Sequence, residues 1–239
     1  MKKAIGIIPA RYDSKRFPGK PLVKILGKPM IQWTYEQAKK VKSLDEVVVA
    51  TDDIRIEKPA QEFKANVIFT TSDPNSGTER VAEVSESRAY QAYPIIINIQ
   101  CDEIKFEPEI IDSMVELLQD DSIQMATIGY RNRNMEMNQN ENVAKVGINE
   151  QGEAIWFSRS PIPYMESDYF LQHVGIYGYQ RDFLLKYKDL PDCPEERNEG
   201  LEQLRALRAG VKIKVIESAS ATISINTPDD IEMIRKKDA

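Results

Sequence analysis

The chain has 239 residues, enough to bury a substantial core in one large domain or two small ones. Its net charge of −6 argues against broad nucleic-acid binding, because cations do not dominate the composition. No apolar stretch approaches the roughly 20 residues that cross a bilayer, and the apolar run after Lys3 is too short for a signal peptide. We therefore expect a cytoplasmic protein with no membrane insertion.

Apolar runs alternate with amphipathic stretches along the chain. Strands are predicted at residues 4–8, 46–50, 66–70, 95–99, 125–130, 143–148, 172–179 and 212–217. Helices are predicted at 29–41, 53–63, 77–90 and 108–118, and a last one with Thr227 as N-cap and Pro228 at the first helical position. Steady strand–helix alternation predicts an α/β fold with a mostly parallel sheet covered by helices on both faces.

Two details of the second predicted helix stay open. Pro59 lies inside it, so the helix either begins later than drawn or is kinked. Asp52 and Asp53 lie at its start, and we favour helix capping for both.

The pattern loosens between about residues 130 and 200, where Asn-rich and Pro-rich loops accompany a Trp-Phe pair and a Tyr-rich strand. We expect a single domain over 1–239 in which this region is inserted to cover the ligand edge of the sheet.

The most informative segment is residues 7–22, which read IIPARYDSKRFPGKPL. Its prolines and Gly19 cannot continue the strand, and four cations follow within ten residues, namely Arg11, Lys15, Arg16 and Lys20. A basic loop at the carboxyl end of a central strand is where open α/β sheets bind anions. Cations, backbone N–H groups and the Ser14 hydroxyl suit a polyphosphate, although a solvated charged turn has the same composition.

This loop resembles the nucleotide-binding signature of the sugar nucleotidyltransferases that use CTP, most closely the 3-deoxy-D-manno-octulosonate cytidylyltransferase family. Further matching blocks follow in family order and cover essentially the whole chain: GKPMI from Gly27, VATDD from Val49, SGTER from Ser76, FSR from Phe157, HVGIYGY from His173 and LEQLR from Leu201. The resemblance implies a Rossmann-like, GT-A-like nucleotidyltransferase fold with a mixed, mostly parallel sheet and an inserted subdomain for sugar binding and dimerisation.

The same resemblance implies a reaction and its site. CTP would activate 3-deoxy-D-manno-octulosonate, or a close analogue such as its 8-amino form, to the CMP-sugar with release of pyrophosphate, for lipopolysaccharide biosynthesis. The nucleotide would be bound by Pro9, Ala10, Arg11, Ser14, Arg16, Lys20 and Ser76. Arg16 and Lys20 would also act in catalysis, at the leaving pyrophosphate where negative charge accumulates.

The sugar acid would contact a mixed set of cations and neutral donors and acceptors: Arg80, Gln100, Arg159, His173, Tyr177, Glu202 and Gln203. Such a set suits a carboxylate with several hydroxyls. His173 is the chain's only histidine, and a purely structural role is equally open for it.

Asp102 corresponds to the family's metal-binding aspartate, and we expect it to act in catalysis as a Mg²⁺ ligand. The second metal position of the family is an aspartate, but here it is Asn226. An amide oxygen ligates Mg²⁺ without bringing charge, so the metal should bind more weakly. Glu103 or Asp229 would be the acid that compensates.

Asn226, together with Cys101 and Ile104 where the family has glycine and proline, leaves open a non-catalytic descendant that still binds nucleotide or sugar. A cytidylyltransferase for a different sugar acid is a further alternative. The family pairs as homodimers, and the aromatic stretch 156–179 could supply the interface, although core packing explains its aromatics equally well.

Overall fold

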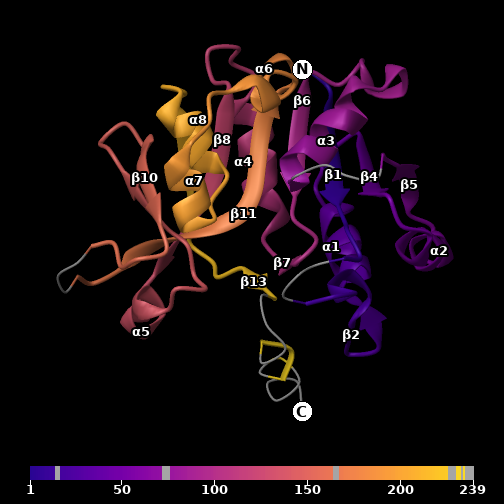
Figure 1. Cartoon of the computed structure of the whole chain (residues 1–239), viewed down its shortest axis with the longest axis horizontal. Coiled ribbons are helices and arrows are strands. Elements are labelled where there is room, and N and C mark those ends of the chain that lie inside the picture. The colour runs from indigo at the N-terminus through magenta and orange to yellow at the C-terminus, as the bar shows by residue number, and fades with distance from the viewer. Residues whose placement is uncertain (14–16, 72–75, 164–166, 226–229, 233, 235–239) are drawn as a thin grey trace.

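The computed structural model describes residues 1–13, 17–71, 76–163, 167–225, 230–232 and 234. Within these residues a nine-stranded sheet forms the centre of the molecule, with helices on both faces (Figure 1). One path through the sheet runs in the order β10 (Ala154–Ser158), β9 (Lys145–Ile148), β11 (Phe170–Gln180), β6 (Ile95–Ile99), β1 (Ala4–Pro9), β4 (Glu46–Thr51) and β5 (Asn66–Phe69). Beyond β11, β8 (Met125–Asn132) pairs with β11, and β12 (Ile213–Ser218) pairs with β8.

The strand directions make the sheet mixed but mostly parallel. β6, β1, β4 and β5 pair in parallel, and β12 is parallel to β8. β11 runs antiparallel to both β6 and β8. Parallel strands bring their carboxyl ends to one edge, so the ends of β1, β4 and β6 meet there. This confirms the predicted fold class.

Helices cover the two faces of the sheet because alternate residues of each buried strand point to opposite sides. Ile5 and Ile7 of β1 belong to one core cluster, and Ala4 and Ile8 belong to the other. The helices are α1 (Met30–Ala38), α2 (Ile54–Glu62), α3 (Gly77–Glu86), α4 (Pro108–Leu117), α5 (Met135–Gln139), α6 (Arg181–Leu184), α7 (Pro194–Glu199) and α8 (Gln203–Arg208). The first cluster includes residues of α3 and α8, and the second includes residues of α1, α2 and α4.

Short elements complete the framework of the ligand edge. Single 3₁₀ turns lie at Lys20–Leu22, Arg88–Tyr90 and Tyr187–Asp189. The hairpin of β2 (Lys24–Ile25) and β3 (Lys28–Pro29) leads into α1, and β7 (Glu103–Lys105) pairs with β13 (Ile223–Ser224). No helix among the described ranges is both long enough and apolar enough to cross a membrane.

Two predicted helices differ from the observed ones. The helix predicted at 77–90 ends at Glu86, because Ser87 adopts an extended backbone (φ −59°, ψ 137°), and a 3₁₀ turn follows. α2 begins at Ile54 and keeps Pro59 inside, so the structure excludes the later start, one of the two alternatives left open for this helix. Thr227 and Pro228, predicted to begin the last helix, lie outside the described residues.

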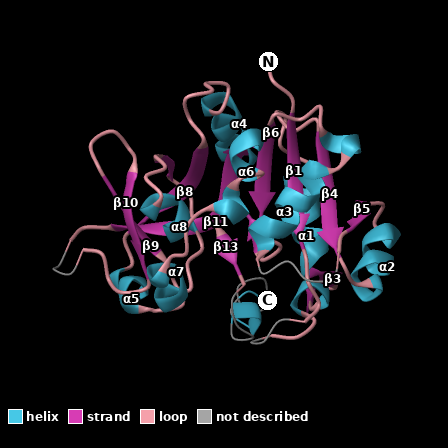
Figure 2. Ribbon diagram, turned by 45° about the horizontal axis from the view of Figure 1, so that its top comes forward, coloured by secondary structure: helices cyan, strands magenta, loops and turns pink. Residues whose placement is uncertain are grey.

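The segment between about residues 130 and 200 supplies α5, α6, α7, the β9–β10 hairpin and all of β11. Figure 2 shows this hairpin and α5 at one end of the molecule, with β5 and α2 at the other. The division into a domain with an inserted subdomain stays a prediction.

Candidate active site

Three cavities lie at the ligand edge, and Gln100, the residue after β6, lines all of them. The β1 pocket, of about 220 Å³, follows the carboxyl ends of β1 and β6. The β11 pocket, of about 470 Å³, lies over the middle of β11, and the α7 pocket, of about 480 Å³, lies beside the end of α7. A ligand in one of them is therefore in reach of a ligand in another.

The described residues predicted to bind nucleotide gather in the β1 pocket: Pro9, Ala10, Arg11, Lys20 and Ser76. Ser76 is the N-cap of α3, and its hydroxyl accepts a hydrogen bond from the backbone N–H of Glu79. At the next residue, Gly77, the space for a side chain is tight, because a Cβ there would lie 3.0 Å from Nε2 of Gln100. Ser14 and Arg16 lie outside the described residues.

Lys20 reaches the other side of this pocket and forms an ion pair with Asp102. The Nζ–Oδ2 distance is 2.6 Å, and both side chains are largely shielded from solvent. Gly19 makes this possible, because its φ of 69° belongs to the left-handed region that favours glycine, and the chain turns there into the 3₁₀ helix that carries Lys20. The pair therefore places a cation and a carboxylate together where β1 and β6 end.

The two residues that depart from the family motif beside Asp102 fit their surroundings. The carbonyl of Cys101 accepts a hydrogen bond from the Thr34 hydroxyl. Cys101 is not among the non-glycine residues with positive φ in the described chain, which are Leu26 and Lys64. Cys101 therefore needs no glycine-like backbone. Burial raises the pKa of its thiol to about 12, so the thiol stays protonated. Ile104 is buried in a small apolar cluster, where it packs as a core residue.

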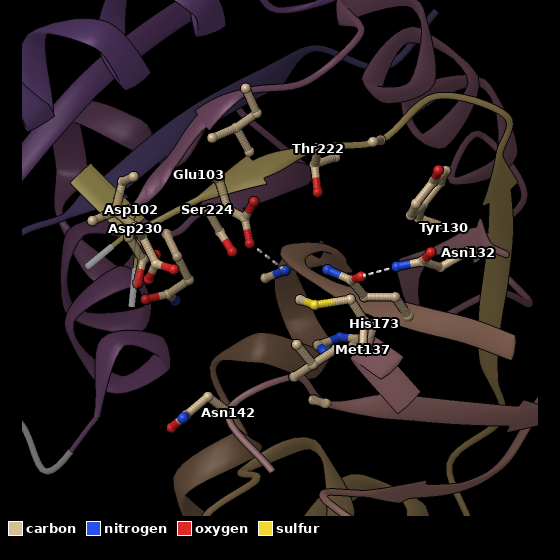
Figure 3. Close-up of a pocket in the computed structure, with 18 of the residues that line it drawn as sticks. Asp102, Glu103, Tyr130, Asn132, Met137, Asn142, His173, Thr222, Ser224 and Asp230 are labelled. Atoms are coloured by element: carbon tan, nitrogen blue, oxygen red, sulfur yellow. Dashed lines mark hydrogen bonds between the residues drawn. The ribbon is translucent and has the colours of Figure 1, made fainter. Parts of the chain in front are cut away.

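The residues predicted to bind the sugar acid spread over all three pockets. Arg80 lines the β1 pocket, and His173 lines the β11 pocket. Arg159 and Tyr177 line both the β11 and the α7 pockets, whereas Glu202 and Gln203 line the α7 pocket. Figure 3 shows the β11 pocket with Asp102, Ser224 and Asp230 gathered at one end and Tyr130 and Asn132 at the other.

Arg159 follows β10 and is held by hydrogen bonds on several sides. Its backbone N–H donates to Oε2 of Glu199 at 2.8 Å, and its Nε donates to the Glu199 carbonyl at 2.8 Å. Its Nη1 donates to the carbonyl of Glu141 at 3.0 Å. The guanidinium is thus fixed at the junction of the β11 and α7 pockets, where a planar cation suits a carboxylate.

His173 has a structural contact and also faces the pocket. Its Nε2 lies 3.0 Å from the Thr127 hydroxyl, and its ring packs edge-on against Phe157 with centroids 5.2 Å apart. Burial, and then the charge of Arg159, lower the pKa of His173 to about 3. The imidazole is therefore neutral at physiological pH, and its contact with a sugar stays a prediction.

A polar network backs the α7 pocket. Tyr177 donates from its hydroxyl to Oε1 of Gln203 at 3.1 Å, and the Thr78 hydroxyl donates to the carboxyl group of Glu202. Burial raises the pKa of Glu202 to about 7. Glu202 is therefore partly protonated near neutral pH and can donate as well as accept a hydrogen bond.

Arg80 is only 4% exposed and is paired inside the protein. Its Nη2 lies 3.2 Å from Oδ2 of Asp52, and its Nη1 donates to the Thr70 hydroxyl. Asp53 caps α2, with Oδ1 accepting from the Arg55 backbone N–H at 2.8 Å, which confirms capping for this residue. For Asp52 the capping prediction is wrong, because the buried guanidinium of Arg80 takes its carboxylate.

Asp102 offers oxygen ligands suited to Mg²⁺, which in phosphate sites takes one or two carboxylates and completes its shell with substrate and water. The described residues hold no cluster of three His, Cys, Asp or Glu side chains that could bind a metal by itself. The backbone N–H of Ile225 donates to the Asp102 carbonyl at 3.1 Å, which ties the chain to Asp102 one residue before position 226. Asn226 and Asp229 lie outside the described residues.

Glu103 points away from the Lys20–Asp102 pair. Its Oε1 accepts from the Gly175 backbone N–H at 2.8 Å, as Figure 3 shows, and its Oε2 is buried without a hydrogen-bond partner. Burial, and then the charge of Asp102, raise the pKa of Glu103 well above its ordinary value. Glu103 thus belongs to the floor of the β11 pocket, and its predicted role as a compensating metal ligand stays untested.

The sequence reasoning missed several residues of the site. Thr78, Thr127 and Lys145 contact the predicted residues through partly buried hydrogen bonds, and Asp52 forms an ion pair with Arg80. Thr78 and Asp52 stand in the matching blocks SGTER and VATDD, but no local pattern indicates the contacts of these four residues, because their partners are distant in sequence. A buried lysine at the start of a strand, such as Lys145, was the one signal that periodicity could have given.

Comparisons with known proteins agree with this geometry. A family model described as cytidylyltransferase matches residues 5–213. A 3-deoxy-manno-octulosonate cytidylyltransferase of Leptospira interrogans is 46% identical over 98% of this chain and 95% of its own length, and one of Escherichia coli is 42% identical over 98% and 96%.

Solved structures give the same picture. The structure of a CMP:2-keto-3-deoxy-manno-octonic acid synthetase complexed with CTP matches with a TM-score of 0.88 at 41% identity, covering 98% of both chains. A putative glucose-1-phosphate thymidylyltransferase from Bacillus anthracis matches with a TM-score of 0.69 at 17% identity, over 98% of this chain and 94% of its own, and shows the fold alone.

Proposed function

The chain belongs to the cytidylyltransferase family, and we propose that it transfers CMP from CTP to 3-deoxy-manno-octulosonate, releasing pyrophosphate. The activated sugar acid would serve lipopolysaccharide biosynthesis. The observation that carries the proposal is the junction at Gln100, where a pocket with the cations Arg11 and Lys20 meets a pocket bounded by the guanidinium of Arg159. Such a junction suits the attack of an acidic sugar's hydroxyl on a nucleotide phosphate.

In the β1 pocket, we assign the nucleotide to the main chain at Pro9 and Ala10 and to Ser76, with Arg11 and Lys20 facing the phosphates. Negative charge builds up on the leaving pyrophosphate during phosphoryl transfer, so a cation fixed before the reaction stabilises the transition state more than the ground state. Lys20 is held in place by Asp102 and meets this requirement. Ser14 and Arg16 belong to the same proposed site by resemblance.

Mg²⁺ is the proposed cofactor, with Asp102 and Asn226 as its protein ligands. When bound, the metal would neutralise phosphate charge and favour ionisation of the attacking hydroxyl, as divalent ions do in phosphoryl transfer. The carboxylate of Asp102 fits this role, because it is oriented by Lys20 and lies where the β1 and β11 pockets meet.

The sugar acid is assigned to the junction of the β11 and α7 pockets. Arg159 would bind its carboxylate, since a guanidinium matches a carboxylate in shape and charge. Its hydroxyls would be read by the neutral and mixed groups that surround Arg159, namely Gln100, His173, Tyr177, Glu202 and Gln203. Arg80 would act from the wall of the β1 pocket.

We further propose that the chain forms a homodimer through the β9–β10 hairpin. Ile155 and Trp156 of β10 are 60% and 40% exposed, and β10 is the end strand of its path through the sheet. Large exposed apolar side chains on an end strand suit an interface. Sedimentation of the parent and of Ile155→Lys tests this, with a dimer expected for the parent and a monomer for the variant.

A cytoplasmic location stays a prediction.

The function is tested by pyrophosphate release from CTP with 3-deoxy-manno-octulosonate across a Mg²⁺ titration, with Asn226→Asp beside the parent. We expect turnover in the parent, and a shift of half-saturation to lower Mg²⁺ in Asn226→Asp because a charged ligand replaces a neutral one. Asp53→Asn is the matched control, since Asn caps a helix as well as Asp does. CTP binding without pyrophosphate release at any Mg²⁺ concentration would contradict the proposal.

A further inference from the structure

Lys145 contacts the main chain of Arg159 and is completely buried. It is the first residue of β9 and pairs with Ser158 of β10 and with Gln172 of β11, so it stands where three strands meet. A fully buried lysine is rare, because its ammonium must leave water and find new acceptors. The structure therefore has to account for this charge.

The ammonium of Lys145 joins two main-chain segments that border the β11 pocket. Its Nζ donates to the carbonyl of Asn140 at 2.8 Å and to the carbonyl of Arg159 at 2.6 Å. Asn140 and Arg159 both line that pocket. One side chain thus sets the separation of two segments that come 19 residues apart in sequence.

These contacts close a ring with the guanidinium. Glu141, the residue after Asn140, accepts through its carbonyl from Nη1 of Arg159 at 3.0 Å. Lys145 therefore fixes the main chain on both sides of the Glu141–Arg159 contact. Glu199 holds Arg159 from the α7 side, so displacement of either segment changes the direction of the guanidinium in the β11 pocket.

We propose that Lys145 is a positioning residue that orients Arg159 for the carboxylate of the sugar acid. The inference rests on the proposed function and deepens it. Lys145 does not touch the substrate in this account, and it acts through the two carbonyls that it bridges. A bidentate cation–carboxylate contact depends on the direction of the guanidinium plane, so loss of the bridge weakens binding of the acid and leaves the nucleotide pocket intact.

The test variant is Lys145→Met, which keeps the length of the side chain and removes its donors. Burial, and then the charge of Arg159, lower the pKa of Lys145 to about 8, so the ammonium opposes folding. Lys145→Met removes this charge but leaves the carbonyls of Asn140 and Arg159 without their donor, so we expect it to fold with a lower free energy of unfolding than the parent. Lys145→Gln is a second variant that keeps amide donors.

The experiment is a double-mutant cycle on KM for the sugar acid and for CTP, with parent, Lys145→Met, Arg159→Met and the double variant. We expect Lys145→Met to raise KM for the sugar acid by about ten-fold or more, with KM for CTP within about three-fold of the parent. In the Arg159→Met background the same change should add little, because its effect passes through Arg159. Lys145→Gln should fall between parent and Lys145→Met.

Lys214→Met is the matched control, since Lys214 also donates to a main-chain carbonyl, that of Gln151, and lines none of the three pockets. An unchanged KM for the sugar acid, a parallel rise in both KM values, or an equal effect in both backgrounds would each overturn the positioning role. If thermal melting shows that Lys145→Met does not fold, Lys145→Gln replaces it in the double-mutant cycle, and the same outcomes decide. A parent that releases no pyrophosphate is a failure of the proposed function instead.

Discussion

Lys20 and Asp102 are 82 residues apart in the chain, yet Nζ of the lysine lies 2.6 Å from Oδ2 of the aspartate. The lysine comes from the loop after β1 and the aspartate from the turn after β6, and the two strands are parallel neighbours. A cation for the leaving phosphates and a carboxylate for the metal are thereby held as one unit. Each orients the other, and each also limits the charge that the other offers to a ligand.

Replacing Lys20 by Met should therefore have two separable effects. We expect kcat to fall by about 100-fold, because the developing charge on pyrophosphate loses a fixed cation. The Mg²⁺ concentration for half-maximal rate should fall, since Asp102 no longer shares its carboxylate with an ammonium. Initial rates of pyrophosphate release over a Mg²⁺ series measure both. Lys28→Met, which removes an ion pair with Glu36, is the control. A kcat equal to that of the parent would contradict the assignment.

Much of the fold follows from local pattern. The run IIINI at 95–99 is apolar, short and bounded by Pro94 and Gln100, and β6 has those bounds. β7 and β13 escaped prediction because two or three residues are too few to show a period. Their pairing depends on the contact between segments about 120 residues apart, which no local pattern records.

For the site, too, local motifs predict some residues, whereas long-range contacts determine the roles of others. Lys20 and Asp102 stand in motifs that the resemblance carries, and the structure brings them together. Asp52 and Asp53 have the same local setting before a helix, and only the buried guanidinium of Arg80 separates their roles. The position of Lys145 in a predicted strand likewise does not reveal its contacts, because Asn140 and Arg159 meet it through the packing of β9, β10 and β11.

His173 should make the protein sensitive to mild acid. Its pKa is lowered to about 3 in the folded protein, from an ordinary value of 6.5. Below pH 6.5 His173 binds a proton in the unfolded chain but stays neutral in the folded protein, so stability is lost as pH falls from 6.5 towards 3. Between pH 7 and pH 5 this group should remove roughly 2 kcal/mol from the free energy of unfolding.

The check is urea unfolding at both pH values for the parent and His173→Gln, whose amide can still bond the Thr127 hydroxyl. We expect the variant to lose less stability than the parent on going to pH 5. Equal losses would show that the imidazole takes up a proton in the folded state.

Glu202 should act in the opposite direction. Its pKa is raised to about 7 from 4.5, mainly by burial. Above pH 4.5 the unfolded chain releases a proton that the folded protein retains, so stability falls as pH rises through about 7. Glu202→Gln keeps an acceptor for the Thr78 hydroxyl and removes the titration. Relative to the parent, it should gain roughly 2 kcal/mol in unfolding free energy between pH 5 and pH 7, measured without substrate. A pH dependence identical to that of the parent would refute the raised pKa.

Asp52 offers a test that separates ion pairing from capping. Asn is as good a helix cap as Asp, so Asp52→Asn would be nearly silent if the residue capped α2. Because Arg80 is 4% exposed and its Nη2 lies 3.2 Å from the Asp52 carboxylate, the same change should leave a buried cation uncompensated. We expect a loss of roughly 2–4 kcal/mol in the free energy of unfolding.

Asp53→Asn is the internal control, because Asp53 does cap α2. Its ion pair with the half-exposed Arg55 contributes little, so the variant should stay within about 0.5 kcal/mol of the parent. Urea titrations of the two variants side by side decide the matter, and equal costs would return Asp52 to the cap.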